Sequence, residues 1–220
     1  MRKVVFANEG IYHIFNRSIE QRPVFTTKRE YNRATLTFDF YRFKSPPLRL
    51  AKFLQLEKTA REIFFINLKK ADKQVEIISY CLMPNHFHFL LRQTSENGIT
   101  KFLSNFANSY TRYFNTKQKR KGPLFEGIFK AVYIETDEQL IHVSRYIHLN
   151  PIASFLIKEN DLDFYPWSSF PEFLNESTDV ICNKSTILNF FPSKKKYRQF
   201  VHDRIDYAQK LEKIKHLILE

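Results

Sequence analysis

Apolar residues recur along this chain with two spacings, which predict strands in some segments and helices in others. Apolar runs rich in strand formers predict strands in three segments: 11–17, 75–91 and 124–134. Apolar residues three or four apart predict helices in five segments: 27–44, 48–70, 97–114, 136–149 and 193–219. The segment 48–70 could form either one helix or a pair of helices. This order of elements predicts an α+β protein in which a small antiparallel sheet carries helices on one face.

Two histidines follow the bend in the segment 75–91. Pro84 and Asn85 predict either two strand pieces around a bend or one strand with a bulge. Side chains alternate between the faces of a strand, so His86 and His88 should point the same way while Phe87 points into the core. Two such imidazoles could bind one metal ion. The spacing alone equally allows two histidines on a half-exposed strand face with no metal.

A helix that begins at Thr136 brings a tyrosine and an asparagine onto one face. Thr136 and the acidic residues after it form a capping pattern. Pro151 disfavours the helical conformation at Asn150, so we predict that the helix ends close to Asn150. Tyr146 and Asn150 are four residues apart and therefore share a face. Taken alone, Tyr146 is also explained as a half-buried aromatic residue whose hydroxyl has a partner.

The other conspicuous tyrosines belong to the segment 97–114. Tyr110 and Tyr113 lie on its apolar stripe, so we interpret them as core or substrate-edge aromatics and not as nucleophiles. The chain also lacks the glycine-rich lysine motif that binds nucleotide phosphates, and an ATP-driven reaction is not expected.

The composition limits the classes of molecule that the protein is expected to bind. The 220 residues carry a formal net charge of +12 and a pI of about 9.6, which favours a nucleic acid over a membrane surface. No apolar run is long enough to span a bilayer, and the start of the chain has no secretory apolar core. Cys81 and Cys182 are too few and too far apart for a disulfide framework. These features predict a cytoplasmic protein that does not associate with membranes.

Several motifs resemble those of one family, the REP-associated tyrosine transposases, which are relatives of the single-tyrosine HUH transposases of bacterial insertion sequences. The resemblance covers about residues 10–170. The motifs that carry it occur in order at 12–17 (YHIFNR), 23–25 (PVF), 84–88 (PNHFH), 122–127 (GPLFEG), 145–151 (RYIHLNP) and 165–169 (YPWSS).

The resemblance implies a fold and a division of the chain. It implies a ferredoxin-like α+β fold with the histidines on a central strand. The tyrosine transposase domain would cover residues 1–170, with a helical insertion at about 44–72. Residues 171–220, loop-rich at first and then helical and basic, would form a C-terminal extension.

The resemblance also implies a reaction. Tyr146 would be the nucleophile, and His86, His88 and Asn150 would hold a divalent metal, Mg²⁺ or Mn²⁺. Such an enzyme cleaves single-stranded or hairpin DNA, forms a 5′-phosphotyrosine bond and rejoins strands without ATP. His13 is expected to make a structural hydrogen bond or to support a metal ligand. His142 and His148 receive no role, and Glu126 could fill either of the roles considered for His13.

The charge pattern suggests where DNA could bind. Candidate phosphate contacts are chosen from charge and position: Arg17, Arg22, Lys119, Arg120, Lys121 and Lys130. The resemblance allows two oligomeric states, because related insertion-sequence enzymes are dimers that exchange tyrosine helices whereas REP-associated members can act as monomers. Two other functions also stay open, namely a nucleic-acid-binding module without catalysis and a metal-dependent hydrolase that uses water.

Overall fold

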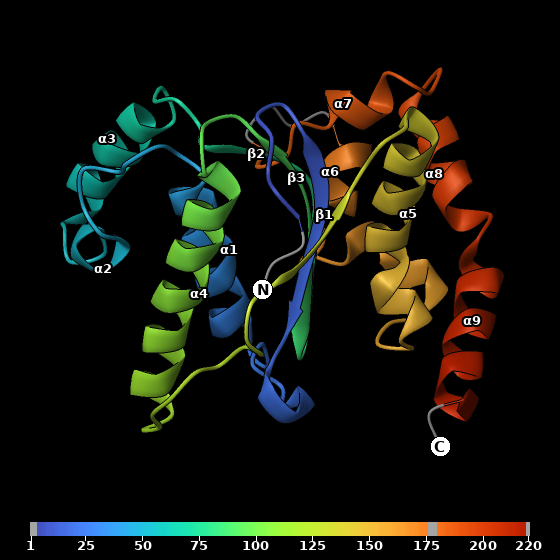
Figure 1. Ribbon diagram of the computed structural model, residues 1–220, viewed down its shortest axis with the longest axis horizontal. Coiled ribbons are helices and arrows are strands. Elements are labelled where there is room, and N and C mark those ends of the chain that lie inside the picture. Colours follow the sequence, from blue (N-terminus) through green and yellow to red (C-terminus); the bar gives the residue numbers. More distant parts are fainter. Residues whose placement is uncertain (1–3, 176–179, 219–220) are drawn as a thin grey trace.

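A four-stranded antiparallel sheet forms the centre of the protein (Figure 1). The computed structural model describes residues 4–175 and 180–218. The strands lie side by side in the order β2-β3-β1-β4. Their bounds are Ile11–Arg17 for β1, Val75–Met83 for β2, His86–Gln93 for β3 and Lys130–Tyr133 for β4. The predicted α+β class with an antiparallel sheet is therefore confirmed.

Strands β2 and β3 form a hairpin that turns at Pro84 and Asn85, which settles the choice between a bend and a bulge at that point. Met83 pairs with His86 across the turn. The Pro84 carbonyl accepts hydrogen bonds from the backbone of Val24 and Phe25, which follow β1, at 2.7 and 3.0 Å. The turn is thus tied to the segment after β1.

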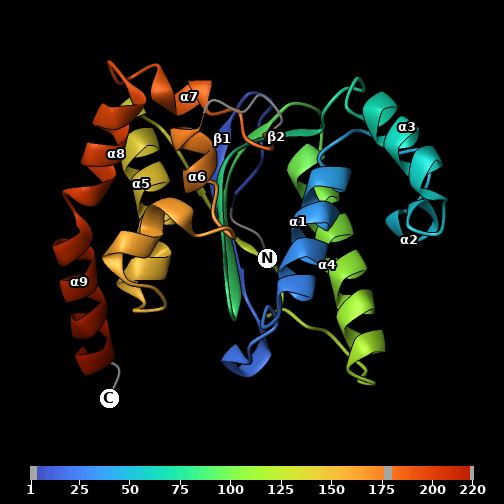
Figure 2. The ribbon, with the colours of Figure 1, turned by 180° about the vertical axis from the view of Figure 1, so that it is seen from behind.

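Helices cover both faces of the sheet, whereas the sequence argument expected one face. On one side lie α1 (Lys28–Tyr41) and α4 (Gly98–Lys117), and on the other side lie α5 (Asp137–Ala153) and the helices after it (Figures 1 and 2). All but one of the residues of β2 are buried, so both of its faces need a cover.

Helix α5 continues beyond the predicted stop. Thr136 caps its start by accepting a hydrogen bond from the Gln139 backbone at 3.1 Å, as predicted. Pro151 lies inside the helix, which ends at Ala153. A proline in the last turn removes one backbone donor, and the Pro151 carbonyl accepts from the Leu156 backbone at 2.9 Å. The prediction that Pro151 ends the helix near Asn150 was therefore wrong.

The predicted strand at 124–134 is also shorter than expected, because only β4 forms a ladder. Phe125 makes an isolated bridge to Ser18, and Gly127 then has a positive φ of 32° that interrupts the extended conformation. The segment before β4 is therefore a connection along β1.

The remaining helices cover the insertion and the C-terminal part. The insertion contains α2 (Leu50–Phe53) and α3 (Lys58–Leu68), which share a small core with Phe40 of α1 and with Phe43. The predicted helix 193–219 is divided into α8 (Lys194–His202) and α9 (Ile205–Ile218), and residue 219 lies outside the described residues. The short elements are η1 (Ile19–Gln21), η2 (Glu159–Phe164), α6 (Phe170–Leu174) and α7 (Ser185–Leu188).

The C-terminal helices dock on the rest of the chain. Tyr197, Val201 and Ile205 belong to the same buried core as the sheet residues. The domain boundary at residue 170 remains a prediction. Within the described residues, no helix combines the length and apolarity required to cross a membrane.

Candidate functional site

A cavity of about 640 Å³ opens on the face of the sheet that carries α5. Residues of β1, β3, β4, η1, α5 and α9 are among those that line it. Four of them are the predicted ligands and nucleophile: His86, His88, Asn150 and Tyr146. The fold thus brings together two short sequence segments that are far apart in the chain.

The two histidines lie on β3 with their ring centroids 5.1 Å apart. The Nδ1 atom of His86 lies 2.7 Å from Asn85 Oδ1, and Nδ1 of His88 lies 3.0 Å from Nε2 of His13. Each ring therefore has its Nδ1 atom in a hydrogen bond inside the protein. A metal ion bound by these rings would therefore use the Nε2 atoms. In metal sites, a hydrogen bond to one ring nitrogen commonly orients a histidine that binds the metal through its other nitrogen.

Burial favours the neutral form of His86 and of His13. Burial, with the nearby charge of Arg17, lowers the pKa of His86 to about 4, although a hydrogen bond with Asn150 acts in the opposite direction. Burial also lowers the pKa of His13 to about 4. Neutral imidazole is the form that binds a metal. With Nε2 of His88 used for a metal, its Nδ1 carries the proton and donates it to His13.

Helix α5 supplies the tyrosine and the amide. The Asn150 Nδ2 atom donates to the Tyr146 carbonyl at 2.9 Å, which leaves Oδ1 as the atom that could bind a metal. The Tyr146 ring meets the His88 ring edge-on, with centroids 5.6 Å apart, and lies 5.8 Å from His13. The Tyr146 side chain is 45% exposed. The tyrosine is therefore next to the histidines and also accessible to a ligand.

The predicted phosphate contacts are divided between two places. Arg17 and Lys130 line the cavity, and Arg17 pairs with His86 across β1 and β3. The other four are outside it: Arg22, Lys119, Arg120 and Lys121. Arg22 forms an ion pair with Glu20. A role for these four in the cavity itself has no support in their positions.

The cavity also contains residues that the sequence did not single out. Glu212 reaches it from α9, and Asn16 and Gln21 line it from β1 and η1. No local signal marks Glu212, because its place depends on how α9 packs against α5. Glu126, for which two roles were considered, also lines the cavity.

The two histidines without a predicted role lie apart from the cavity. His148 is fully buried and is bonded through Nε2 to Ser169 and through Nδ1 to the Tyr197 hydroxyl, at 2.9 and 2.8 Å. Burial lowers the pKa of His148 to about 3. His142 is hydrogen-bonded to Arg145 at 2.6 Å. Both therefore have structural partners.

The donor set suits an open metal site. In the described part of the chain, no group of three His, Cys, Asp or Glu side chains could hold a metal by itself. Two imidazoles and an amide oxygen leave several positions for water or phosphate oxygens. The residues therefore fit an ion that is bound partly by the protein and partly by a substrate.

Comparisons with known proteins agree with this fold. The family model "Transposase IS200 like" matches residues 51–150, a segment that contains all four predicted ligand and nucleophile residues. The match begins inside the predicted insertion, whose limits therefore remain a prediction. A comparison with curated proteins gives no significant match.

A solved structure described as a REP-associated tyrosine transposase bound to a REP hairpin shares the fold. The aligned region covers 79% of this chain and 84% of the solved chain, with a TM-score of 0.53 and 13% sequence identity. The two proteins therefore share an α+β fold. The resemblance to tyrosine transposases is confirmed, and the central segment matches the IS200-like transposase family.

Proposed function

We propose that the protein is a metal-dependent enzyme that cleaves single-stranded or hairpin DNA and transfers the strand through Tyr146. The observation that carries the proposal is the common cavity of His86, His88, Asn150 and Tyr146. The matched family and the shared fold support a transposase reaction.

The reaction follows from the chemistry of a phenol and a phosphodiester. The Tyr146 oxygen attacks the phosphorus and loses its proton to solvent. The bond from phosphorus to the 3′ oxygen breaks, and that oxygen leaves as a 3′-hydroxyl after taking up a proton. The 5′-phosphate stays bound to the tyrosine. A second 3′-hydroxyl reverses these steps, so no ATP is needed.

The residues of the cavity have separate parts in this scheme. His86 and His88 would hold Mg²⁺ or Mn²⁺ through their Nε2 atoms, and Asn150 would hold it through Oδ1. When bound, the ion neutralises charge on the phosphate and favours the phenolate, whose ordinary pKa is about 10. Arg17 and Lys130 hold the neighbouring phosphates.

The test is a search for the covalent intermediate. Labelled hairpin oligonucleotides with randomised single-stranded flanks are incubated with the protein and Mn²⁺ or Mg²⁺, and adducts are separated on a denaturing gel. We expect a shifted band that disappears with EDTA and in Tyr146→Phe. Tyr133→Phe is the matched control, because Tyr133 is 48% exposed, close to the 45% of Tyr146, and lies outside the cavity.

The other outcomes separate the competing functions. An adduct that persists in Tyr146→Phe would show that another residue is the nucleophile. Cleavage without an adduct would indicate a metal-dependent hydrolase that uses water. Salt-sensitive binding without cleavage, unchanged in His86→Ala, would indicate a nucleic-acid-binding module.

A further inference from the structure

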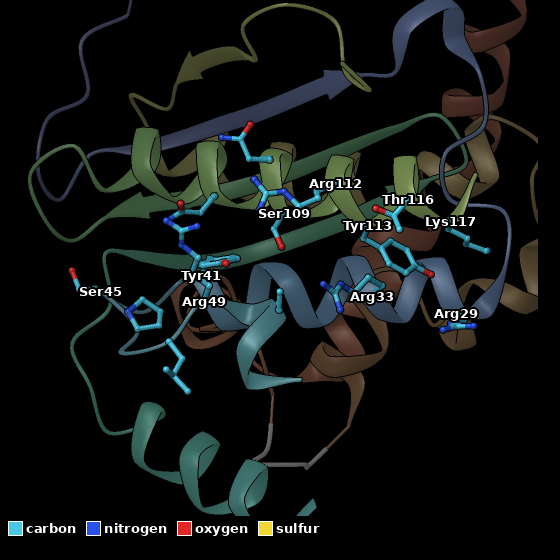
Figure 3. A pocket seen from close by; sticks show the side chains of 15 residues that line it. Arg29, Arg33, Tyr41, Ser45, Arg49, Ser109, Arg112, Tyr113, Thr116 and Lys117 are labelled. Atoms are coloured by element: carbon cyan, nitrogen blue, oxygen red, sulfur yellow. The ribbon is translucent and has the colours of Figure 1, made fainter. Parts of the chain in front are cut away.

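Besides the active-site cavity, the protein has a groove of about 850 Å³ between α1 and α4, on the side of the sheet opposite the candidate active site. Helices α1 and α4 form its sides, and the segment that starts the insertion, residues 45–49, closes one end (Figure 3). Its cations come from all three of these parts of the chain: Arg29, Arg33, Arg49, Arg112 and Lys117. Among the described residues that line it, none is Asp or Glu.

The charge balance of the groove differs from that of an ordinary solvated helix surface. On such a surface, acidic residues commonly alternate with basic ones. Here, among the described residues, the one carboxylate bonded to a lining cation is Glu30, which accepts from Lys117 at 2.7 Å. The Glu30 side chain is itself fully buried, and it is not among the residues that line the groove. The remaining positive charge therefore faces the groove.

Within the part of the chain that the structure describes, two polar atoms of residues that line the groove have no hydrogen-bond partner. The Arg33 guanidinium lies 5.1 Å from the centre of the Tyr113 ring. Figure 3 shows the two side chains next to each other in the groove. Arg33 Nε and the Tyr113 hydroxyl are both buried and unpaired. Burial also lowers the pKa of Arg33. A buried polar group without a partner is unfavourable, so a ligand that accepts hydrogen bonds would be favoured here.

The other lining residues suit a nucleic acid. Tyr41 and Tyr113 provide aromatic rings, and Asn105 and Asn108 provide amides beside the cations. Basic grooves with aromatic rings bind the phosphates and bases of extended strands. The Tyr41 hydroxyl accepts a hydrogen bond from the Leu50 backbone at 3.2 Å, so the insertion also fixes one wall of the groove.

The chain connects the groove with the candidate active site. Arg17 and Gln21 line the active-site cavity, and Arg29 lines the groove at the start of α1. The segment between them passes around the end of the sheet (Figures 1 and 2) and carries the exposed Arg22. A strand that leaves the cavity along this segment would arrive at the groove.

We propose, on the basis of the DNA substrate in the proposed function, that the groove between α1 and α4 binds the phosphodiester backbone of DNA that extends beyond the active-site cavity. Its ligand is a chain of regularly spaced phosphates, and its role is to add affinity and to hold the flank of the substrate. The insertion, through Arg49, completes this second site. The site does not take part in the chemistry at Tyr146, so it can be tested separately.

The test compares long and short DNA. Fluorescence anisotropy measures the binding of a hairpin with long single-stranded flanks and of the same hairpin without them. The variant Arg29→Gln/Arg49→Gln/Arg112→Gln removes three exposed cations of the groove. The control Lys58→Gln/Lys70→Gln/Lys195→Gln removes three exposed cations elsewhere, so the change in net charge is equal.

We expect the groove variant to bind the long DNA about tenfold more weakly or worse, with a salt dependence reduced by about two counterions, since each phosphate contact on a single strand contributes about 0.7. Binding of the short DNA, and adduct formation on it, should be unchanged. The control variant should bind both DNAs nearly as the wild type does. Circular dichroism melting verifies that both variants fold.

Three outcomes would overturn the proposal. One is an equal loss in the groove and control variants, which would indicate charge without a site. Another is an equal loss on long and short DNA. The third is full competition by a free nucleoside triphosphate at micromolar concentration, which would indicate a small-anion site. The binding assay also works with Tyr146→Phe, so failure of the proposed catalysis would not affect it.

Discussion

His13 on β1 and His88 on β3 are joined by a contact of 3.0 Å between Nε2 of the first ring and Nδ1 of the second. The two rings are nearly parallel, with an interplanar angle of 19°. Both lie on the face of the sheet that is covered by α5, and each contacts the ring of Tyr146 on that helix. His13 thus fixes the orientation of a predicted ligand from the adjacent strand.

Replacement of His13 should weaken metal binding. His13→Phe keeps an aromatic ring but removes the acceptor for Nδ1 of His88, and outer-shell changes of this kind typically cost about 10–100-fold in metal affinity. Titration calorimetry with Mn²⁺ measures the change. His13→Gln, which retains an acceptor, should recover part of the loss. Wild-type affinity in His13→Phe would assign His13 a purely structural role.

The local signals in the sequence were sufficient for the elements that carry the site. The Thr136 capping pattern located the start of α5, and the alternation along β3 placed His86 and His88 on one face. These signals succeed because a cap and a strand face are decided by neighbouring residues. The side of α5 shared by Tyr146 and Asn150 follows in the same way.

The misjudged features depend on packing between distant segments. Pro151 was expected to end α5, yet the helix continues to Ala153 in the folded chain. Glu212 enters the cavity because α9 packs along α5. The bond between His13 and His88 depends on the register of β1 against β3. Neither propensity nor periodicity contains that information.

Glu30 should contribute a pH-dependent part of the stability. Burial alone would raise its pKa, but hydrogen bonds from Lys117, Thr26 and Thr27 outweigh burial and lower it from 4.5 to about 2. A lowered carboxylate pKa stabilises the fold above pH 4.5, and this stability is lost as the pH falls towards 2. At about 1.4 kcal/mol per pKa unit, it amounts to about 3 kcal/mol at neutral pH.

Glu30→Gln should therefore lower the free energy of unfolding by about 3 kcal/mol at pH 7. At pH 3.5 the difference from the wild type should shrink by roughly 1.4 kcal/mol, because the unfolded chain already holds the proton. Urea unfolding at the two pH values measures this. A difference that is the same at both would mean that Glu30 acts through its shape and not through its charge.

Tyr197 should be needed for the docking of α8 on α5. Its hydroxyl lies 2.8 Å from Ser144 Oγ and 2.8 Å from His148 Nδ1, and all three residues are fully buried. Tyr197→Phe removes one atom and leaves both partners unsatisfied, so it should cost about 1–3 kcal/mol of unfolding free energy. Tyr207→Phe is the control, because Tyr207 is 56% exposed. Equal stability of the two variants would contradict the prediction.

Asn150 allows the two functions of one amide to be separated. Its Nδ2 atom donates to the Tyr146 carbonyl, while Oδ1 is the atom proposed to bind the metal. Asn150→Leu removes both and should weaken Mn²⁺ binding at least about tenfold, or about 1.4 kcal/mol. Asn150→Asp keeps an oxygen ligand, which as a carboxylate suits Mn²⁺, and should retain binding although the donor is lost. Calorimetric titration compares both variants with the wild type. Loss of affinity in the leucine variant alone would identify the oxygen as the ligand atom. Equal loss in both variants would mean that the amide only holds the helix.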